Sequence, residues 1–306
     1  MSEQFTDIGG GITLCHESFG DPADPPVLLV MGLATQMIGW HEDFCEGLAE
    51  RGFHVTRFDN RDIGRSTHMD FPPPTPGQMF SRRLRPEQYE LGDMAEDAAG
   101  LLRELDLAPA HIVGASMGGM IGQTLAAHHP EMVRSLVSIM SNTGNRWRGQ
   151  PSPSVYKYLL RRPPTNRDAY VERAAEIFGI VGSQGLHSEE DIRTLASRSF
   201  DRGYDARGGG RQLGAIIKSG DRTKTLRRIK VPTLVIHGTK DKLVRPSGGR
   251  ATAKAIPGAR LMTVDGMGHD LPRALWPKLI DAIATHARAA EGERAGTPAG
   301  VAGSLR

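Results

Sequence analysis

Short apolar runs alternate with longer amphipathic stretches along most of the chain. Residues 12–18 alternate loosely, as a half-exposed strand does, and residues 27–31 are apolar on both faces, which is typical of a central strand in a parallel sheet. Further short runs predict strands at 54–58, 111–113, 133–140, 233–237 and 260–264. Between them, apolar residues spaced by three or four positions predict helices at 38–51, 93–107, 120–129, 249–255 and 275–288. This order predicts an α/β fold with a mostly parallel central sheet flanked by helices.

The alternation of strands and helices breaks in the middle of the chain. Helical patterns are present there at 169–178 and 189–200, but no strand–helix order, so we expect an inserted helical cap. A small, polar C-terminal stretch with Gly and Pro predicts a disordered tail. The predicted organisation is a core of residues 1–141 and 229–288, a helical cap of residues 142–228 and a tail of residues 289–306.

Two segments are distinctive in composition. Residues 68–90 are predicted to be irregular, because the four prolines within 72–77 should prevent both a helix and a central strand there. The predicted cap contains seventeen Lys and Arg residues against nine Asp and Glu residues. We expect most of these basic side chains to form a solvated outer face.

The overall composition is that of an ordinary globular protein, with 306 residues of which 39% are apolar and 24% charged. A net charge of +3 gives no indication of nucleic-acid binding. The two cysteines, Cys15 and Cys45, indicate neither a disulfide framework nor a zinc site, and we expect no metal and no cofactor. No apolar run approaches the length of a membrane span, and no charged-then-apolar leader opens the chain. We therefore expect a soluble cytoplasmic protein with a small-molecule partner and no membrane or nucleic-acid partner, and the oligomeric state stays open.

A glycine-rich turn follows the predicted strand at 111–113 and precedes the predicted helix at 120–129. Its residues 114–118 have the form Gly-x-Ser-x-Gly, with Ser116 at the centre. In such a turn the flanking glycines leave room for a serine that projects from a cramped bend, and the helix that follows points its positive end at the hydroxyl. The alternative is a glycine-rich turn with an idle serine. The strand before it and the helix after it favour a nucleophile.

A nucleophilic serine needs a base, and the base needs an acid that fixes its tautomer. Asp241 and His269 each follow a predicted strand, at the carboxyl ends where open α/β sheets build their sites. Each could by itself be an ordinary loop residue, but together they follow the expected order Ser, Asp, His. The competitors are His237 as the base, which we expect to be structural, and Asp265 or Asp270 as the acid. No carboxylate follows the strand at 133–140, which further favours Asp241.

Two backbone N–H groups near the serine would be needed to hold an oxyanion. Met117 supplies one, because it follows the nucleophile, and Leu33 is the candidate for the other, because it follows Gly32 after a buried strand. Methionines also gather near the predicted strand ends, and flexible methionines suit pockets that accept several shapes. The residues that we expect to line the substrate pocket are Met31, Met37 and Met267.

The turn at Ser116, the loop after the strand at 54–58, the segment 231–238 and the Gly-Met-Gly-His sequence at 266–269 together resemble the α/β-hydrolase superfamily. The resemblance covers the chain up to about residue 288. Met31 and Gly32 stand where many members carry His-Gly, which is similar to esterases that include anthracycline methylesterases.

The resemblance implies an α/β-hydrolase fold and cofactor-free ester hydrolysis, and the covering cap favours short to medium acyl esters. A cofactor-free perhydrolase, a C–C bond hydrolase and a non-catalytic ligand-binding member of the fold remain alternatives. Epoxide hydrolases and dehalogenases are disfavoured, because they use an aspartate at the position of Ser116.

Overall fold

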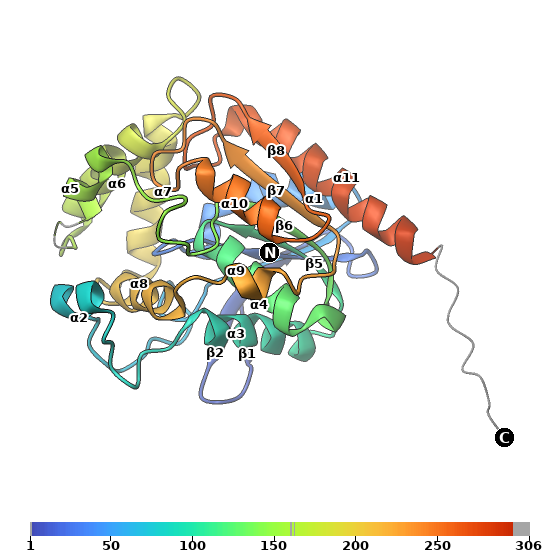
Figure 1. The fold of residues 1–306 in the computed structure, drawn as a ribbon, viewed down its shortest axis with the longest axis horizontal. Coiled ribbons are helices and arrows are strands. Elements are labelled where there is room, and N and C mark those ends of the chain that lie inside the picture. The colour runs from blue at the N-terminus through green and yellow to red at the C-terminus, as the bar shows by residue number, and fades with distance from the viewer. Residues whose placement is uncertain (1, 160, 162, 296–306) are drawn as a thin grey trace.

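The fold is built on one twisted sheet (Figure 1). The computed structural model describes residues 2–159, 161 and 163–295, and within them the strand order of the sheet is β1-β2-β4-β3-β5-β6-β7-β8. The β1–β2 and β2–β4 pairs are antiparallel, and the pairs from β4 through β3 to β8 are parallel. The strands are β1 (Gln4–Asp7), β2 (Thr13–Phe19), β3 (Pro26–Val30), β4 (His54–Phe58), β5 (Ala110–Ala115), β6 (Val133–Ile139), β7 (Thr233–Gly238) and β8 (Arg260–Val264).

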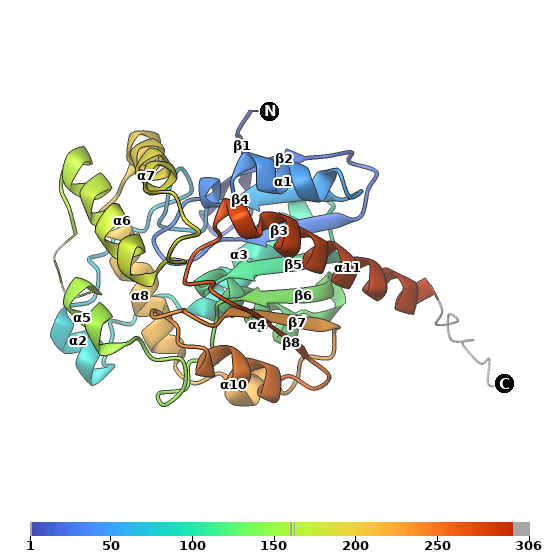
Figure 2. The ribbon, with the colours of Figure 1, turned by 90° about the horizontal axis from the view of Figure 1, so that it is seen from above.

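Helices connect the parallel strands and fill the interval between β6 and β7. Those of the sheet layers are α1 (Glu42–Ala49), α3 (Leu91–Glu104), α4 (Met117–His128), α10 (Ser247–Ala255) and α11 (Trp276–Ala295). The short helix α2 (Pro76–Ser81) lies in the segment between β4 and α3, away from the strands in Figures 1 and 2. Those between β6 and β7 are α5 (Pro153–Leu159), α6 (Arg167–Val181), α7 (Glu189–Gly203), α8 (Gly208–Ser219) and α9 (Thr223–Leu226). Short 3₁₀ turns occur at η1 (Met37–Gly39), η2 (Pro130–Met132) and η3 (Arg273–Leu275).

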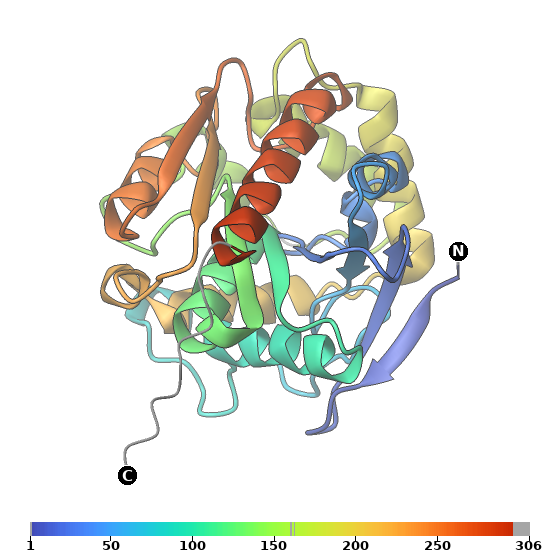
Figure 3. The same cartoon turned by 90° about the vertical axis from the view of Figure 1, so that its right-hand side faces the viewer.

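Two apolar layers cover the sheet, one on each face. Residues of α3 and α4 pack with Leu28 and Ile112 on one face, whereas α1 and α11 pack with Leu29 and Val113 on the other. Neighbouring strand residues point to opposite faces, so each central strand needs apolar residues on both sides. In Figure 3 the red helix α11 and the teal-green helices α3 and α4 lie on opposite sides of the strands. None of the helices in the described ranges combines the length and the apolar character that a membrane span requires.

Helices α5 to α8 lie together on one side of the sheet in both Figure 1 and Figure 2. Helix α9 differs, because it packs against α4 and α10 in the sheet layers. The predicted segment 142–228 therefore ends in a helix that belongs to the core. Not all of its basic residues are solvated. Arg211 and Arg222 are buried, the Arg202 side chain is 8% exposed, and all three donate hydrogen bonds to acceptors within the protein.

Several elements were not predicted from the sequence, or have other bounds than those predicted. Strand β1 is short and exposed and so lacks an apolar pattern. The predicted helix at 38–51 is divided into η1 and α1, and α5, α8 and α9 had no predicted counterpart. Helix α2 begins at Pro76, inside the stretch predicted to exclude helix, because Thr75 and Gln78 form a capping box and proline is tolerated in the first helical turn.

The predicted tail begins too early. Helix α11 continues to Ala295, so residues 289–295 are helical, and residues 296–306 lie outside the described part. The added turns have partners in the fold, because Ala290 is buried and Glu291 forms an ion pair with Arg134 at 2.9 Å.

Candidate active site

Ser116 occupies the sharp turn between β5 and α4. Its φ is +55°, a left-handed value that is uncommon for a residue other than glycine and costs about 1–3 kcal/mol. A Cβ atom on Gly114 would collide with the carbonyl of Gly118, and a Cβ atom on Gly118 would collide with the carbonyl of Val30. Both glycines are therefore required for this turn to lie against β3, and the turn fixes the direction of the serine side chain.

Ser116, His269 and Asp241 form a continuous chain of hydrogen bonds. His269 Nε2 lies 3.0 Å from Ser116 Oγ, and His269 Nδ1 lies 2.7 Å from Asp241 Oδ2. One tautomer satisfies both contacts: Nδ1–H donates to the carboxylate, and Nε2 accepts the serine hydroxyl. The structure thus brings together three residues that are far apart in the sequence, with the imidazole in the middle.

The carboxylate of Asp241 is buried and held by its own loop. Its Oδ1 accepts hydrogen bonds from the N–H groups of Leu243 at 2.9 Å and Val244 at 2.8 Å. Burial by itself would raise the pKa of Asp241, but the positive charge of His269 and hydrogen bonds from His237 and His269 outweigh it and lower the pKa to about 2. Asp241 is therefore ionised at neutral pH.

His237, the competing base, lies near the acid and the loop that follows it. Its Nε2–H donates to the carbonyl of Val244 at 2.7 Å and lies 3.5 Å from Asp241 Oδ2. Among the described contacts it has none with Ser116. His237 therefore stabilises the loop that carries Asp241.

The loop that carries His269 is fastened to the end of α6. The N–H of His269 donates to the carbonyl of Val181 at 2.7 Å, and the N–H of Gly268 donates to Ser183 Oγ at 2.8 Å. The Ser183 hydroxyl and N–H in turn donate to Asp270 Oδ1. Asp270 is therefore engaged with Ser183. The sequence analysis missed Ser183, since no motif surrounds it.

Asp265, the other competing acid, is also hydrogen-bonded to a residue other than His269. Its Oδ1 accepts a hydrogen bond from the Thr239 hydroxyl at 2.9 Å, in the turn that follows β7. Within the described residues, only Asp241 among the three candidate acids contacts the His269 ring.

Two backbone N–H groups beside Ser116 are available to a ligand. The Met117 amide follows the serine directly, and Gly32 approaches so closely that a Cβ atom there would lie 3.1 Å from Ser116 Cβ. Among the hydrogen bonds of the described residues, the N–H groups of Met117 and Leu33 have no acceptor. The role of these N–H groups as oxyanion donors stays a prediction.

The predicted pocket methionines lie in the apolar core instead. Met37 and Met267 have 0% of their surface exposed, and Met31 packs against Gly39 with 7% exposed. Met37 joins Cys15 in one cluster, whereas Met31 and Met267 belong to the layer under α11. Side chains without exposed surface cannot line an open pocket, so the prediction is not supported for Met37 and Met267, and Met31 exposes little surface to one. Over the described ranges, no group of three or more His, Cys, Asp and Glu side chains is arranged to hold a metal.

Comparison with known proteins agrees with the fold. A family model for the alpha/beta hydrolase fold matches residues 25–272. The rhodomycin D methylesterases DauP of Streptomyces sp. (strain C5) and DnrP of Streptomyces peucetius are 31% and 30% identical to this chain over 301 residues, covering 91% of this chain and 96% of each relative. Among solved structures, 2-hydroxy-6-oxo-6-phenylhexa-2,4-dienoate hydrolase from Rhodococcus sp. strain RHA1 has a similar fold, with a TM-score of 0.72 at 21% identity over 94% of this chain and 98% of that one.

The chain belongs to the α/β-hydrolase fold family, as the match to most of its length shows. Within that family it is a hydrolase of the esterase type, related to the rhodomycin D methylesterases.

Proposed function

We propose that the protein is a serine carboxylic-ester hydrolase that works through an acyl-enzyme. The observation that carries the proposal is the hydrogen-bonded chain from Ser116 through His269 to Asp241. In this scheme Ser116 Oγ attacks the ester carbonyl while His269 Nε2 takes the hydroxyl proton. Asp241 keeps the proton of Nδ1 in place and stabilises the imidazolium.

The second half of the reaction uses the same groups. His269 gives its proton to the leaving alkoxide, which departs as an alcohol, and the acyl group remains on Ser116. Water then enters and attacks the acyl carbonyl while His269 takes one of its protons. As the acyl group leaves as the carboxylic acid, His269 returns that proton to Ser116 Oγ. The N–H groups of Leu33 and Met117 are proposed to hold the negative oxygen of both tetrahedral intermediates. One such donor contributes about 10²–10³ in kcat in related sites.

The inserted segment, without α9, is proposed to act as a cap that limits the size of the substrate. Its helix α6 contacts the His269 loop, and its helix α8 contacts the loop of Leu33, so it lies beside the proposed site. A covered site favours soluble esters of short to medium acyl length over emulsified long-chain triglycerides. The two relatives are named as methylesterases, which makes methyl esters the first class to include in a substrate panel.

Covalent labelling tests the proposal directly. A fluorophosphonate should label Ser116 stoichiometrically, and peptide mapping should find the adduct on no other serine. Ser116→Ala should abolish both labelling and turnover of p-nitrophenyl esters while the thermal unfolding midpoint stays near that of the unmodified chain. An unlabelled protein that binds esters without turnover would instead be a ligand-binding member of the fold, and a preference for emulsified triglyceride would contradict the proposed substrate range.

A further inference from the structure

Three consecutive glycines, Gly208 to Gly210, open helix α8, where glycine is a poor helix former. Their lack of side chains has a steric reason, because each lies against a different part of the core. A Cβ atom on Gly208 would collide with the carbonyl of Asp62, and one on Gly209 would lie 2.9 Å from Ala34 Cβ. One on Gly210 would lie 2.7 Å from Pro73 Cβ. Gly209 therefore allows α8 to pack directly on the loop that follows β3, and Gly208 and Gly210 allow it to approach Asp62 and Pro73.

Gln212, one turn further along α8, bonds to that loop. It is completely buried, its Oε1 accepts the N–H of Ala34 at 2.9 Å, and its Nε2 donates to the carbonyl of Arg61 at 2.8 Å. Ala34 has a φ of +54°, a conformation that an alanine adopts only when its surroundings impose it. The hydrogen bond that the Ala34 N–H donates to Gln212 is one contact that stabilises this conformation.

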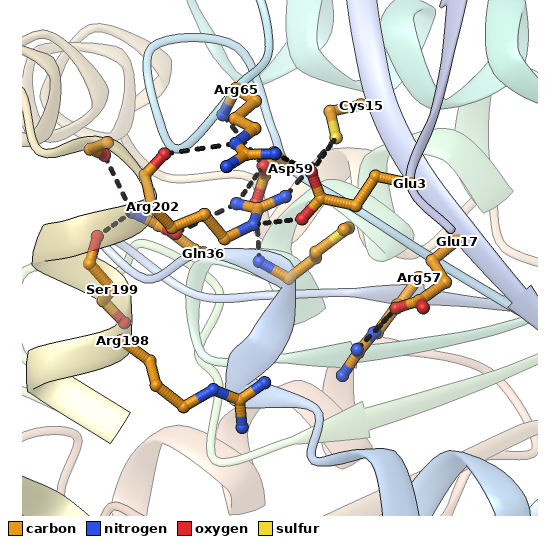
Figure 4. A network of polar contacts seen from close by, with 12 residues as sticks. Glu3, Cys15, Glu17, Gln36, Arg57, Asp59, Arg65, Arg198, Ser199 and Arg202 are labelled. Atoms are coloured by element: carbon orange, nitrogen blue, oxygen red, sulfur yellow. Dashed lines mark hydrogen bonds and ion pairs between the residues drawn. The ribbon is translucent and has the colours of Figure 1, made fainter. Parts of the chain in front are cut away.

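The other end of the loop is anchored by α7 through a separate network (Figure 4). Gln36 Nε2 donates to the carbonyls of Ser199 at 2.7 Å and Gly203 at 2.8 Å, and its Oε1 accepts from Arg202 at 2.9 Å. Asp59 accepts from Arg202 and, at 2.7 Å, from the N–H of Met37. Residues 32–37 are thus held from both sides, and the residue immediately before Ala34 is Leu33.

We propose that Gln212 is a positioning residue for the oxyanion site: it fixes the peptide at Ala34 and thereby the direction of the Leu33 N–H. This inference rests on the proposed function, in which that N–H stabilises the tetrahedral intermediate. Helix α8 then affects kcat through Gln212, in addition to its proposed role in covering the substrate.

The experiment compares Gln212→Leu with Gln88→Leu. Gln88 is a matched control, because it is equally buried and its Nε2 donates to the carbonyls of Tyr89 and Arg211, which also ties α8 to the core. Gln212→Leu should lower kcat for a soluble ester by about 10- to 100-fold, less than the full loss of an oxyanion donor, with KM changed by less than about threefold. Gln88→Leu should keep kcat within about threefold of the unmodified enzyme, even if its thermal unfolding midpoint falls as far as that of Gln212→Leu.

Inhibitor binding distinguishes positioning from general loosening. A trifluoromethyl ketone forms a hemiketal with Ser116 whose oxygen occupies the oxyanion site, whereas the matching carbinol binds without an adduct. In Gln212→Leu the Ki of the ketone should rise by the same factor as kcat falls, and the Ki of the carbinol should stay unchanged. Gln212→Glu, which keeps an acceptor for the Ala34 N–H, should recover part of kcat.

The proposal is overturned if Gln212→Leu keeps kcat within threefold of the unmodified enzyme, if Gln88→Leu loses as much, or if both inhibitors weaken equally. Should Gln212→Leu fail to fold, Gly209→Ala decides, since its methyl group would push on Ala34 and must lower kcat and ketone binding together. Failure of the proposed function is a separate result, because it shows as an unlabelled Ser116 in the unmodified protein.

Discussion

Replacing Asp241 by Asn tests the proposed role of the acid with almost no change in volume. The two loop N–H groups, of Leu243 and Val244, hold one oxygen of the side chain, and an Asn can accept both bonds only with its Oδ1. Its NH₂ group must then face His269 Nδ1, where the carboxylate oxygen now lies at 2.7 Å. A donor at this position selects the tautomer that carries its proton on Nε2, so His269 can no longer accept the proton of Ser116.

The expected loss follows from the wrong tautomer. We expect kcat to fall by about 10³–10⁴, which corresponds to about 4–5.5 kcal/mol in the activation free energy, while KM changes little. Initial rates with a p-nitrophenyl ester, together with the thermal unfolding midpoint, measure the effect. Asp270→Asn is the matched control, because Asp270 bonds to Ser183, and it should cost far less. A kcat within tenfold of the unmodified enzyme in folded Asp241→Asn, or a larger loss in Asp270→Asn, would refute the assignment.

Three further results are expected. Ser183→Ala removes the hydroxyl that joins the segment after α6 to Gly268 and Asp270 of the His269 loop. The change removes two hydrogen bonds, and kcat should fall by about tenfold, with labelling of Ser116 still stoichiometric. An unchanged kcat would show that the loop keeps its position without Ser183. The stability that the lowered pKa of Asp241 contributes is present above the ordinary pKa of an aspartate and is lost as the pH falls toward about 2. Circular dichroism over a pH series measures this loss, and a fold that becomes more stable as the pH falls through this range would contradict it. Dialysis against EDTA should leave kcat unchanged, and a loss restored by a divalent metal would contradict a reaction carried by side chains and backbone alone.

The local patterns of the sequence determined the parallel part of the sheet and the turn at Ser116. A buried parallel strand must be apolar on both faces and a sharp strand–helix turn must have glycines, so both leave a signal within a few consecutive residues. The same reasoning selected Asp241 and His269, because each follows a strand whose carboxyl end lies at the edge where the site forms.

The supports of the site were decided only by the tertiary structure. Ser183 and Gln212 bond to residues 85 and 178 positions away, Gly268 and Ala34, and a contact over that distance leaves no periodic pattern in the chain. Helix α8 was hidden for a related reason: its glycines are unfavourable for a helix and are explained by the close approach of the core. The pocket methionines were misplaced because flexible apolar side chains near strand ends suit a core as well as a pocket, and burial alone distinguishes the two.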